Sequence, residues 1–383
     1  MVKVLMQNRP DAFSAMGGDT IQMMKTAEYL RKMDVDVDVS LDLRPDLCGY
    51  DLVHLMNITR VEFTYSQLEN AKKFKKPVVL SPIYWNTQRA LSSYVIETLC
   101  NLNLFRFAKD IGSGYLRSIL RNERISFNEV NEIMNNKKLA SIVLREVDHL
   151  LPNSLKEFKI LKHDFPHVFR DREKFSVVPN GVDSRIFCRS SPRKFVEETG
   201  LSDFVLCVGR FGFRKNQLSL IKALKGLGVS LVFIGDVPEN SRFYWMKDAA
   251  DRSYFHKCKQ EADQSCLFLP SISHSALASA YAACKVLALP SFYETPGLVA
   301  LEAALSGANI CITQEGSTSE YFLDYAYYCD PYSLASIREA VLQAYRAPRN
   351  QLLKKHVLEN FTWEHVACAT LNAYQEVLES KNA

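Results

Sequence analysis

The sequence predicts an α/β fold built from two domains, each with a parallel sheet. Short apolar runs typical of buried strands alternate with stretches of helical spacing, which is the pattern of β-α-β units and favours parallel sheets. A stretch with Gly, Ser and Pro at residues 180–193 indicates a linker between two halves. In the second half, polar and charged residues follow several strands at their carboxyl ends, where open α/β sheets bind ligands.

The first domain is expected to begin with a strand at residues 2–6. A helix follows that Asp19 or Thr20 could cap and that reaches about residue 33. Residues 88–146 have a mostly helical pattern and are the least typical part of the chain. The remaining strands of this half are expected at 35–39, 52–56, 78–80, 150–152 and 175–178.

The second domain shows the same alternation. Helical spacing at residues 218–227 follows its first strand, and a last helical stretch covers 363–379. The strands of this half are expected at 205–208, 231–234, 267–269, 286–289 and 310–312.

Composition narrows the class of protein. The 383 residues are 47% hydrophobic, enough for two separate cores, and no apolar run approaches the roughly 18 to 20 residues that span a bilayer. Residues 1–6 fit a first strand better than a secretory signal, so we expect a cytoplasmic protein. The net charge of +4 does not indicate a nucleic-acid surface. The ten cysteines form no C-x-x-C pair and are expected to be reduced thiols, with no zinc site.

Basic residues gather at two places in the first half. One group lies at residues 72–76, and another is spread among apolar residues at 106–124. This surface could make a peripheral contact with anionic lipid at the inner face of the cytoplasmic membrane. It could equally be a solvated face over an ordinary helical core.

A loop with several cations follows the strand at residues 205–208. Arg210 and Lys215 bracket this loop, so both are expected at the carboxyl edge of the sheet. Fixed Arg and Lys charges would stabilise the negative charge that builds on a diphosphate as its bond to a sugar breaks. The alternative is a solvated basic loop.

Two carboxylates stand about two helical turns apart after the strand at 286–289. Glu294 lies just before a helix expected to begin near Pro296, and Glu302 lies inside it. Gly297 would let a diphosphate approach the unpaired N–H groups of the first turn, while the carboxylates face sugar and ribose hydroxyls. This pattern predicts a sugar-nucleotide site. The alternative is one acidic residue favoured by the helix dipole and one solvated glutamate.

The order of these motifs resembles the retaining glycosyltransferase family 4, the glycosyl transferases group 1. Its members have the GT-B architecture, in which two Rossmann-like, doubly wound parallel-sheet domains face a central cleft. The resemblance implies an acceptor-binding domain at 1–185, a nucleotide-sugar-binding domain at 186–362 and a helix at 363–383 that crosses back. It covers nearly the whole chain and rests on Gly17-Gly18, residues 151–154, residues 178–183, Arg210 with Lys215, residues 294–302, residues 316–317 and residues 361–364.

The resemblance also implies a role for each matching residue. Arg210 and Lys215 would hold the donor diphosphate and stabilise it as it leaves, Glu294 would contact the transferred sugar, and Glu302 would bind the ribose. Arg210, Lys215 and Glu294 would form the catalytic set. No metal or other cofactor is implied. In such enzymes a diphosphate oxygen takes the acceptor's proton, so no separate base of the protein is needed. Further donor contacts are implied for Gly17, Gly18, Pro296, Gly297 and Leu298.

One position departs from the family's pattern. Many members carry a histidine facing the donor sugar in the loop after a middle strand of the first domain, where this chain has Tyr84, Trp85 and Asn86. Any of these three could replace its hydrogen bond. His54 is the nearest histidine, but a histidine within an apolar strand is more often a hydrogen-bonded core residue.

The implied function is metal-independent, retaining transfer of a hexose from a GDP- or UDP-linked donor to a saccharide or lipid-linked acceptor. The usual setting of the family is the synthesis of bacterial surface polysaccharides such as lipopolysaccharide. Alternatives stay open. One is another enzyme of the same architecture, either a sugar-nucleotide epimerase, which needs no acceptor, or a phosphorylase. The other is a non-catalytic sugar-nucleotide-binding protein. A dinucleotide-binding dehydrogenase is disfavoured because Gly17-Gly18 lacks the G-x-G-x-x-G spacing.

Overall fold

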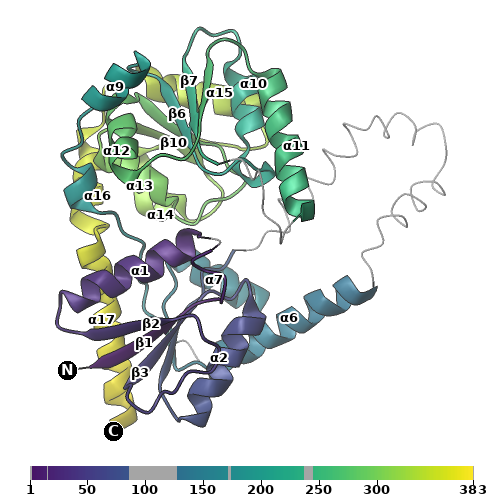
Figure 1. The fold of residues 1–383 in the computed structure, drawn as a ribbon, viewed down its shortest axis with the longest axis vertical. Coiled ribbons are helices and arrows are strands. Elements are labelled where there is room, and N and C mark those ends of the chain that lie inside the picture. Colours follow the sequence, from purple (N-terminus) through teal and green to yellow (C-terminus); the bar gives the residue numbers. More distant parts are fainter. Residues whose placement is uncertain (1, 15, 86–126, 171–173, 237–244, 383) are drawn as a thin grey trace. The chain divides into compact units, whose positions relative to one another are not determined.

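The computed structural model describes residues 2–14, 16–85, 127–170, 174–236 and 245–382 (Figure 1). They form two compact units, each with its own parallel sheet, which confirms the expected fold class. Unit 1 comprises Met1–Pro152, Phe158–Ser176 and Leu371–Ala383, and unit 2 comprises Asn153–Glu157 and Val177–Thr370.

These units divide the chain at other places than the boundaries 185/186 and 362/363 expected from the sequence. The segment that follows Val177 belongs to unit 2 because Val182 forms a parallel bridge with Thr362. A Cβ on Gly181 would lie 2.9 Å from the backbone of Thr362 and Trp363, so these two segments approach as closely as a glycine allows. The long last helix therefore begins in unit 2 and ends in unit 1.

The sheet of unit 1 has five strands in the order β2-β1-β3-β4-β5. Strand β3 is buried over its whole length, as expected for a parallel strand covered on both faces. The strand order reverses between β1 and β3, and this switch point is where such sheets bind ligands. The elements are β1 Lys3–Gln7, α1 Gly18–Arg31, β2 Asp36–Ser40, β3 Leu52–Met56, α2 Val61–Lys73, β4 Val78–Ser81, α6 Phe127–Glu146, β5 His149–Leu150, α7 Leu155–Asp164, whose first turn is in unit 2, and the end of α17 Trp363–Asn382.

The sheet of unit 2 has six strands in the order β11-β10-β9-β6-β7-β8. The order reverses between β6 and β9, which pair in parallel at Val205 with Val286. Helices α10, α11 and α15 pack on one another, as do α8, α9, α12, α13 and α16, and Figure 1 shows helices on both sides of the sheet. The elements are α8 Ser184–Phe187, α9 Arg193–Thr199, β6 Val205–Val208, η1 Phe213–Lys215, α10 Gln217–Leu224, β7 Leu231–Ile234, α11 Trp245–Glu261, β8 Cys266–Leu269, α12 His274–Ala283, β9 Val286–Leu289, α13 Leu298–Leu305, β10 Asn309–Thr313, α14 Thr318–Phe322, η2 Leu323–Tyr325, β11 Tyr327–Cys329, α15 Leu334–Arg346 and α16 Gln351–Asn360.

One expected strand is wrong, and one strand was not expected. Residues 175–178 form no strand and contribute only a bridge between Phe175 and Leu150, because Val177 is exposed and Pro179 has no N–H for a ladder. Strand β11 is three residues long and too short for a periodic signal. The other expected strands are present within about two residues of their expected bounds.

Two helix starts also differ from expectation. Gly17, and not Asp19 or Thr20, occupies the N-cap of α1, because Asp19 instead pairs with Arg9 at 3.1 Å. Helix α13 begins at Leu298, since its N-cap Gly297 has a left-handed φ of 74° and Pro296 precedes that residue.

The described cysteines are all free thiols, as expected. Burial raises the pKa of Cys207 and of Cys284 to about 12, so both remain protonated at neutral pH. They serve as small apolar residues of the core of unit 2.

The end of α17 is fixed to the sheet of unit 1 by a buried hydrogen-bonded histidine. His54 Nδ1 lies 2.7 Å from the hydroxyl of Tyr374, and its Nε2 lies 2.9 Å from the hydroxyl of Ser81. Burial lowers the pKa of His54 to about 3, so the ring is neutral at physiological pH. His54 is thus the core residue that the sequence favoured.

Replacing Tyr374 with Phe should lower the free energy of unfolding by about 1 to 3 kcal/mol, because one ring nitrogen of the buried histidine loses its partner. Thermal and urea unfolding at pH 7 measure this loss. Tyr345→Phe is the control, since no hydrogen bond of that hydroxyl is found within the described ranges. Equal stability of Tyr374→Phe and Tyr345→Phe would contradict the assignment.

Candidate functional site

An ion pair crosses the switch point of unit 2. Lys215 follows β6 and Glu294 follows β9, and Lys215 Nζ lies 2.5 Å from Glu294 Oε1. The side chains are 16% and 5% exposed, so the pair is held mostly away from water. The hydroxyl of Ser291 donates a second hydrogen bond to Glu294 Oε1 at 2.7 Å. The structure therefore brings together two of the residues that the sequence singled out.

Burial alone would raise the pKa of Glu294, but the positive charges of Lys215 and Arg214 and the hydrogen bonds from Lys215 and Ser291 outweigh it. The net effect lowers the pKa of this carboxyl below its ordinary value. Glu294 is accordingly an ionised acceptor of hydrogen bonds at neutral pH.

The loops that carry the pair are joined by one asparagine. Asn216 has a left-handed φ of 56° and donates from its side chain to the carbonyl oxygens of Pro290 and Pro331 at 3.0 and 2.8 Å. It thereby ties the loop after β6 to those after β9 and β11. Sequence analysis missed this residue, although a polar residue beside a helix start is the available signal.

Aromatic side chains stack across the same loops. The rings of Phe213 and Phe292 lie 4.5 Å apart, and Tyr332 lies 5.1 Å from Phe292. Arg214 accepts a backbone hydrogen bond from Phe292 at 2.9 Å, and its guanidinium lies 5.3 Å from the ring of Tyr293. This packing fixes the short turn η1 that ends at Lys215.

Glycines allow the close approaches that the site needs. Gly209 has φ 141°, and a Cβ there would lie 3.4 Å from Cε of Lys215, so the glycine leaves room for the lysine stem. A Cβ on Gly235 would lie 2.1 Å from the carbonyl oxygen of Gly209. The ends of β6 and β7 can approach this closely only because Gly235 lacks a side chain.

A third glycine holds the backbone of Glu294. Gly316 has φ 110°, and a Cβ there would lie 1.8 Å from the carbonyl oxygen of Glu294. The N–H of Glu294 donates to Glu315 at 3.1 Å, and the N–H of Ser317 donates to Glu294 at 3.0 Å. The loop after β10 thus holds the backbone of Glu294 by hydrogen bonds. In the strand order, β10 lies on one side of β9 and β6 on the other, so this loop and the loop that carries Lys215 approach Glu294 from opposite sides.

Glu302 occupies α13 and does not join the ion pair. Its Oε2 accepts a hydrogen bond from the hydroxyl of Tyr281 at 2.9 Å. Burial raises the pKa of Glu302 to about 7, although the residue keeps some exposed surface. Because this pKa is close to neutral pH, hydrogen bonds from a hydroxyl-rich ligand would change the ionised fraction of Glu302. Helix α13 begins at Leu298, directly after Pro296 and Gly297. No side chain caps the N–H groups of its first turn.

Arg210 lies in the predicted loop but has a different partner. Its Nε lies 3.5 Å from Asp251 of α11, and its side chain is 53% exposed. The role given to Arg210 at the diphosphate stays a prediction. The sequence analysis did not predict a role for Asp251. Its carboxylate also packs against Gly212, since a Cβ there would lie 3.0 Å from it.

Gly17 and Gly18 lie at the switch point of unit 1. A Cβ on Gly17 would lie 2.7 Å from Oδ1 of Asp19, whose Oδ2 accepts from Arg9 at 3.1 Å and from Asn57 at 3.3 Å. These contacts fix the start of α1. The donor contact expected of the two glycines stays a prediction.

The loop that departs from the family's pattern is described as far as Trp85. Tyr84 donates to Asp164 of α7 at 2.9 Å and packs edge-on against Phe165. Asn86 lies outside the described residues. The role of the missing histidine therefore has no assigned residue.

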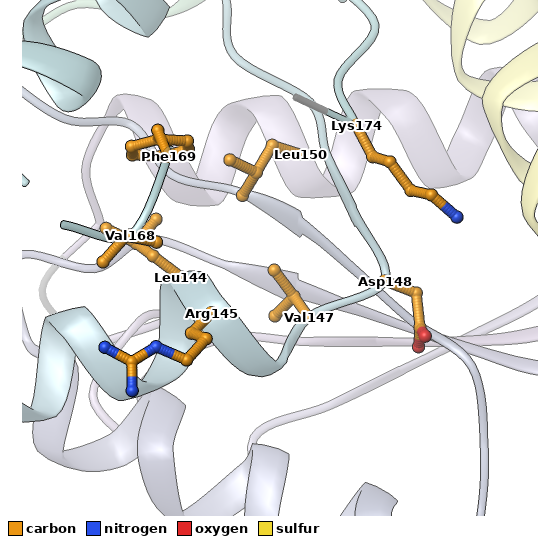
Figure 2. A pocket seen from close by; sticks show the side chains of 8 residues that line it. All are labelled: Leu144, Arg145, Val147, Asp148, Leu150, Val168, Phe169 and Lys174. Carbon is orange, nitrogen blue, oxygen red and sulfur yellow. The ribbon is translucent and has the colours of Figure 1, made fainter. Parts of the chain in front are cut away.

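A separate pocket lies beside the edge strand β5 of unit 1 (Figure 2). Asp148 at its rim accepts from the N–H of Val78 at 2.8 Å and pairs with Lys381 at 2.9 Å, so its carboxylate serves the fold. The lining residues are Leu144, Arg145, Val147, Asp148, Leu150, Val168, Phe169 and Lys174.

Among the residues that the structure describes, no group of three or more His, Cys, Asp or Glu side chains could hold a metal ion. Within the same ranges, no helix is both long and apolar enough to cross a membrane. The basic stretch at 106–124 lies outside them, whereas Lys72 pairs with Glu146 at 3.8 Å and Lys76 donates to the carbonyl oxygen of Tyr50.

Comparison with solved structures identifies the class of fold. Sucrose-phosphate synthase of Thermosynechococcus elongatus matches 99% of this chain and 100% of its own, with a TM-score of 0.73 and 16% identity. HepE of Anabaena in complex with UDP matches 98% of this chain and 100% of its own, with a TM-score of 0.67 and 14% identity. The chain has the GT-B fold.

Comparison of sequences finds a family that part of the chain resembles. Residues 192–357 match the model described as glycosyl transferases group 1. A glycogen synthase of Mycobacterium tuberculosis is 27% identical over 52% of this chain and 48% of its own length. A D-inositol 3-phosphate glycosyltransferase of Stackebrandtia nassauensis is 27% identical over 62% and 56%. The chain spans about half the length of these relatives. Residues 192–357 are therefore similar to the glycosyl transferases group 1.

Replacing Gly316 with Ala should destabilise the protein by about 2 kcal/mol or more, because the added Cβ collides with the backbone of Glu294. Gly307→Ala is the matched control. Gly307 has φ 90° and nothing within 4 Å of its Cβ position, so only backbone strain of about 1 to 2 kcal/mol applies there. Thermal unfolding compares the two variants, and equal melting temperatures would contradict this collision.

Proposed function

We propose that the chain is a metal-independent, retaining glycosyltransferase that moves a hexose from a nucleotide diphosphate sugar to a hydroxyl of a saccharide or lipid-linked acceptor. The observation that carries this proposal is the buried pair of Lys215 and Glu294 across the switch point of unit 2. It offers a cation for a departing diphosphate and an ionised carboxylate for sugar hydroxyls at one place.

Lys215 can serve both partners at once. An ammonium group has three N–H donors, and only one of them is needed for Glu294 Oε1. The others are available to a diphosphate oxygen, whose charge grows as the bond to the sugar breaks. Arg210, on the same loop and half exposed, is the second cation for this diphosphate.

The carboxylates of Glu294 and Glu302 recognise two different parts of the donor. Glu294 accepts hydrogen bonds from the transferred hexose, and Glu302 accepts them from the ribose of the nucleotide. The unpaired N–H groups at Gly297 and Leu298 suit a phosphate or sugar oxygen. A donor contact through the N–H groups of Gly17 and Gly18, at the start of α1, is proposed from the family likeness alone.

The reaction breaks the bond between the anomeric carbon and the diphosphate oxygen and forms a bond from that carbon to the acceptor oxygen on the same face. The acceptor's proton passes to a diphosphate oxygen, so the products are the glycosylated acceptor and the nucleoside diphosphate. No base of the protein is needed for this balance. Fixed charges beside the leaving group provide the main stabilisation.

Uridine and guanosine are both candidates for the donor base. The structures of Anabaena HepE that share this fold hold UDP or UDP-glucose, which supports a uridine diphosphate hexose. The acceptor class, the place in bacterial surface polysaccharide or lipopolysaccharide synthesis and the cytoplasmic location, with contact at the inner face of the membrane, are proposed from family likeness. An epimerase would instead convert the donor with no acceptor present.

Glu294→Gln and Lys215→Met should each lower the transfer rate about a hundredfold or more with UDP-glucose or GDP-mannose, whichever is the better donor. The double variant should lose less than the two single losses combined, because the two groups act as a pair. Circular dichroism reports folding. Glu197→Gln is the control, since Glu197 pairs with Arg193 on an exposed surface of the same unit. Near-normal turnover in both site variants would refute the proposal.

Transfer should continue in a strong chelator. No Asp-x-Asp sequence stands at a strand end near the site, and the cations of Lys215 and Arg210 carry out the charge stabilisation that a metal would supply. Rates with and without excess EDTA test this expectation. Loss of activity in EDTA followed by rescue with manganese would overturn it.

A further inference from the structure

The two oxygens of the Glu294 carboxylate have different surroundings. Oε1 accepts from both Lys215 and Ser291, at 2.5 and 2.7 Å. Oε2 has no partner within the described part of the chain and is not among its fully enclosed polar atoms. The residue as a whole is only 4% exposed. The accessible oxygen is thus the one that none of the described side chains occupies.

Lys215 alone cannot account for this asymmetry. A lysine stem has four rotatable carbons, so its ammonium could follow either oxygen of a turning carboxylate. Ser291 has one short side chain, is fully buried and comes directly after Pro290 at the end of β9. Its hydroxyl can reach Glu294 only from a fixed point. The serine therefore decides which oxygen faces inward.

We propose that Ser291 is a positioning residue for the donor sugar: it holds Oε1 of Glu294 on the protein side and leaves Oε2 as the oxygen that accepts hydrogen bonds from the transferred hexose. This inference rests on the proposed function, because it concerns how Glu294 meets the donor. A carboxylate free to rotate would lose part of its preorganisation for the transition state.

The hydroxyl of Ser291 also helps to keep Glu294 ionised. The charged or titratable groups that act on this carboxylate are Lys215 and Arg214 after β6, while Cys207 in β6 and the neighbouring Tyr293 are influenced by it. Burial raises the pKa of both Cys207 and Tyr293, so these two groups stay neutral across the acid range. Loss of one hydrogen bond to the ionised form must therefore raise the pKa of Glu294.

The test compares Ser291→Ala with Ser291→Thr and with Ser279→Ala in the full chain. Ser279 is another buried serine of unit 2, and its hydroxyl accepts from the N–H of Phe195 at 3.0 Å, so its loss removes a buried hydrogen bond away from the site. Two readouts are taken: kcat and KM for UDP-glucose, and the carboxyl carbon resonance of Glu294 as pH is lowered.

Ser291→Ala should lower kcat/KM about tenfold or more and raise the pKa of Glu294, so the acid limb of the pH–rate profile moves to higher pH. Ser291→Thr, which keeps the hydroxyl, should restore both. Ser279→Ala should change neither. An unchanged Glu294 titration in Ser291→Ala overturns the inference even if activity falls through lost stability.

The outcomes also separate this inference from the proposed function. If Glu294→Gln abolishes transfer while Ser291→Ala retains it with an unshifted titration, only the positioning role is wrong. If Glu294→Gln leaves transfer intact, the proposed function itself is wrong, whatever Ser291→Ala does. If Ser291→Ala does not fold, the Ser291→Thr variant provides the test. A folded Ser291→Thr protein with a shifted Glu294 titration and a lowered kcat/KM would count against the inference, because this variant keeps the hydroxyl.

Discussion

The pairing of Lys215 with Glu294 is the constraint on which the arrangement of unit 2 depends. A carboxylate that is 4% exposed is costly to bury unless a cation and hydrogen bonds compensate it. The compensation comes from two loops that are 79 residues apart in sequence and meet only because β6 and β9 are neighbours in the sheet. The strand order therefore creates the pair, and the pair in turn fixes how the loops can lie.

Much of the surrounding structure exists to hold those loops close together. Asn216 joins three of them through its side chain. Gly209 leaves room for the stem of Lys215, and Gly316 lets the loop after β10 approach the backbone of Glu294. Left-handed backbone at Asn216 costs conformational energy that the neighbouring hydrogen bonds offset. The result is a rigid edge, which is the property that electrostatic stabilisation of a leaving group requires.

Unit 1 uses its buried polar groups differently. His54 is neutral and hydrogen-bonded on both ring nitrogens, and Asp19 is held by Arg9 and Asn57 beside the glycine turn. These hydrogen bonds give the buried polar groups of unit 1 their partners, and those of Asp19 fix the backbone at the switch point of its sheet. Glu302 offers a contrast in unit 2. Among the described side chains, Tyr281 is its hydrogen-bond partner and no cation pairs with it, so burial raises its pKa to about 7, whereas cations lower the pKa of Glu294.

The sequence by itself determined the alternation of strands and helices, almost all strand positions and the loops that carry Lys215, Glu294 and Glu302, because apolar periodicity and strand-end polar residues are local signals. Only the tertiary structure decided which charges meet. It paired Lys215 with Glu294 but Arg210 with Asp251, and it revealed Ser291, Asn216 and Gly316 as supports. Strand β11 was not predicted because it is short. The N-cap of α1 was predicted at the wrong residue because Asp19 pairs with Arg9 and does not cap the helix. The physical reason is that partner choice depends on strand order and on close backbone approach, and neither leaves a periodic trace along the chain.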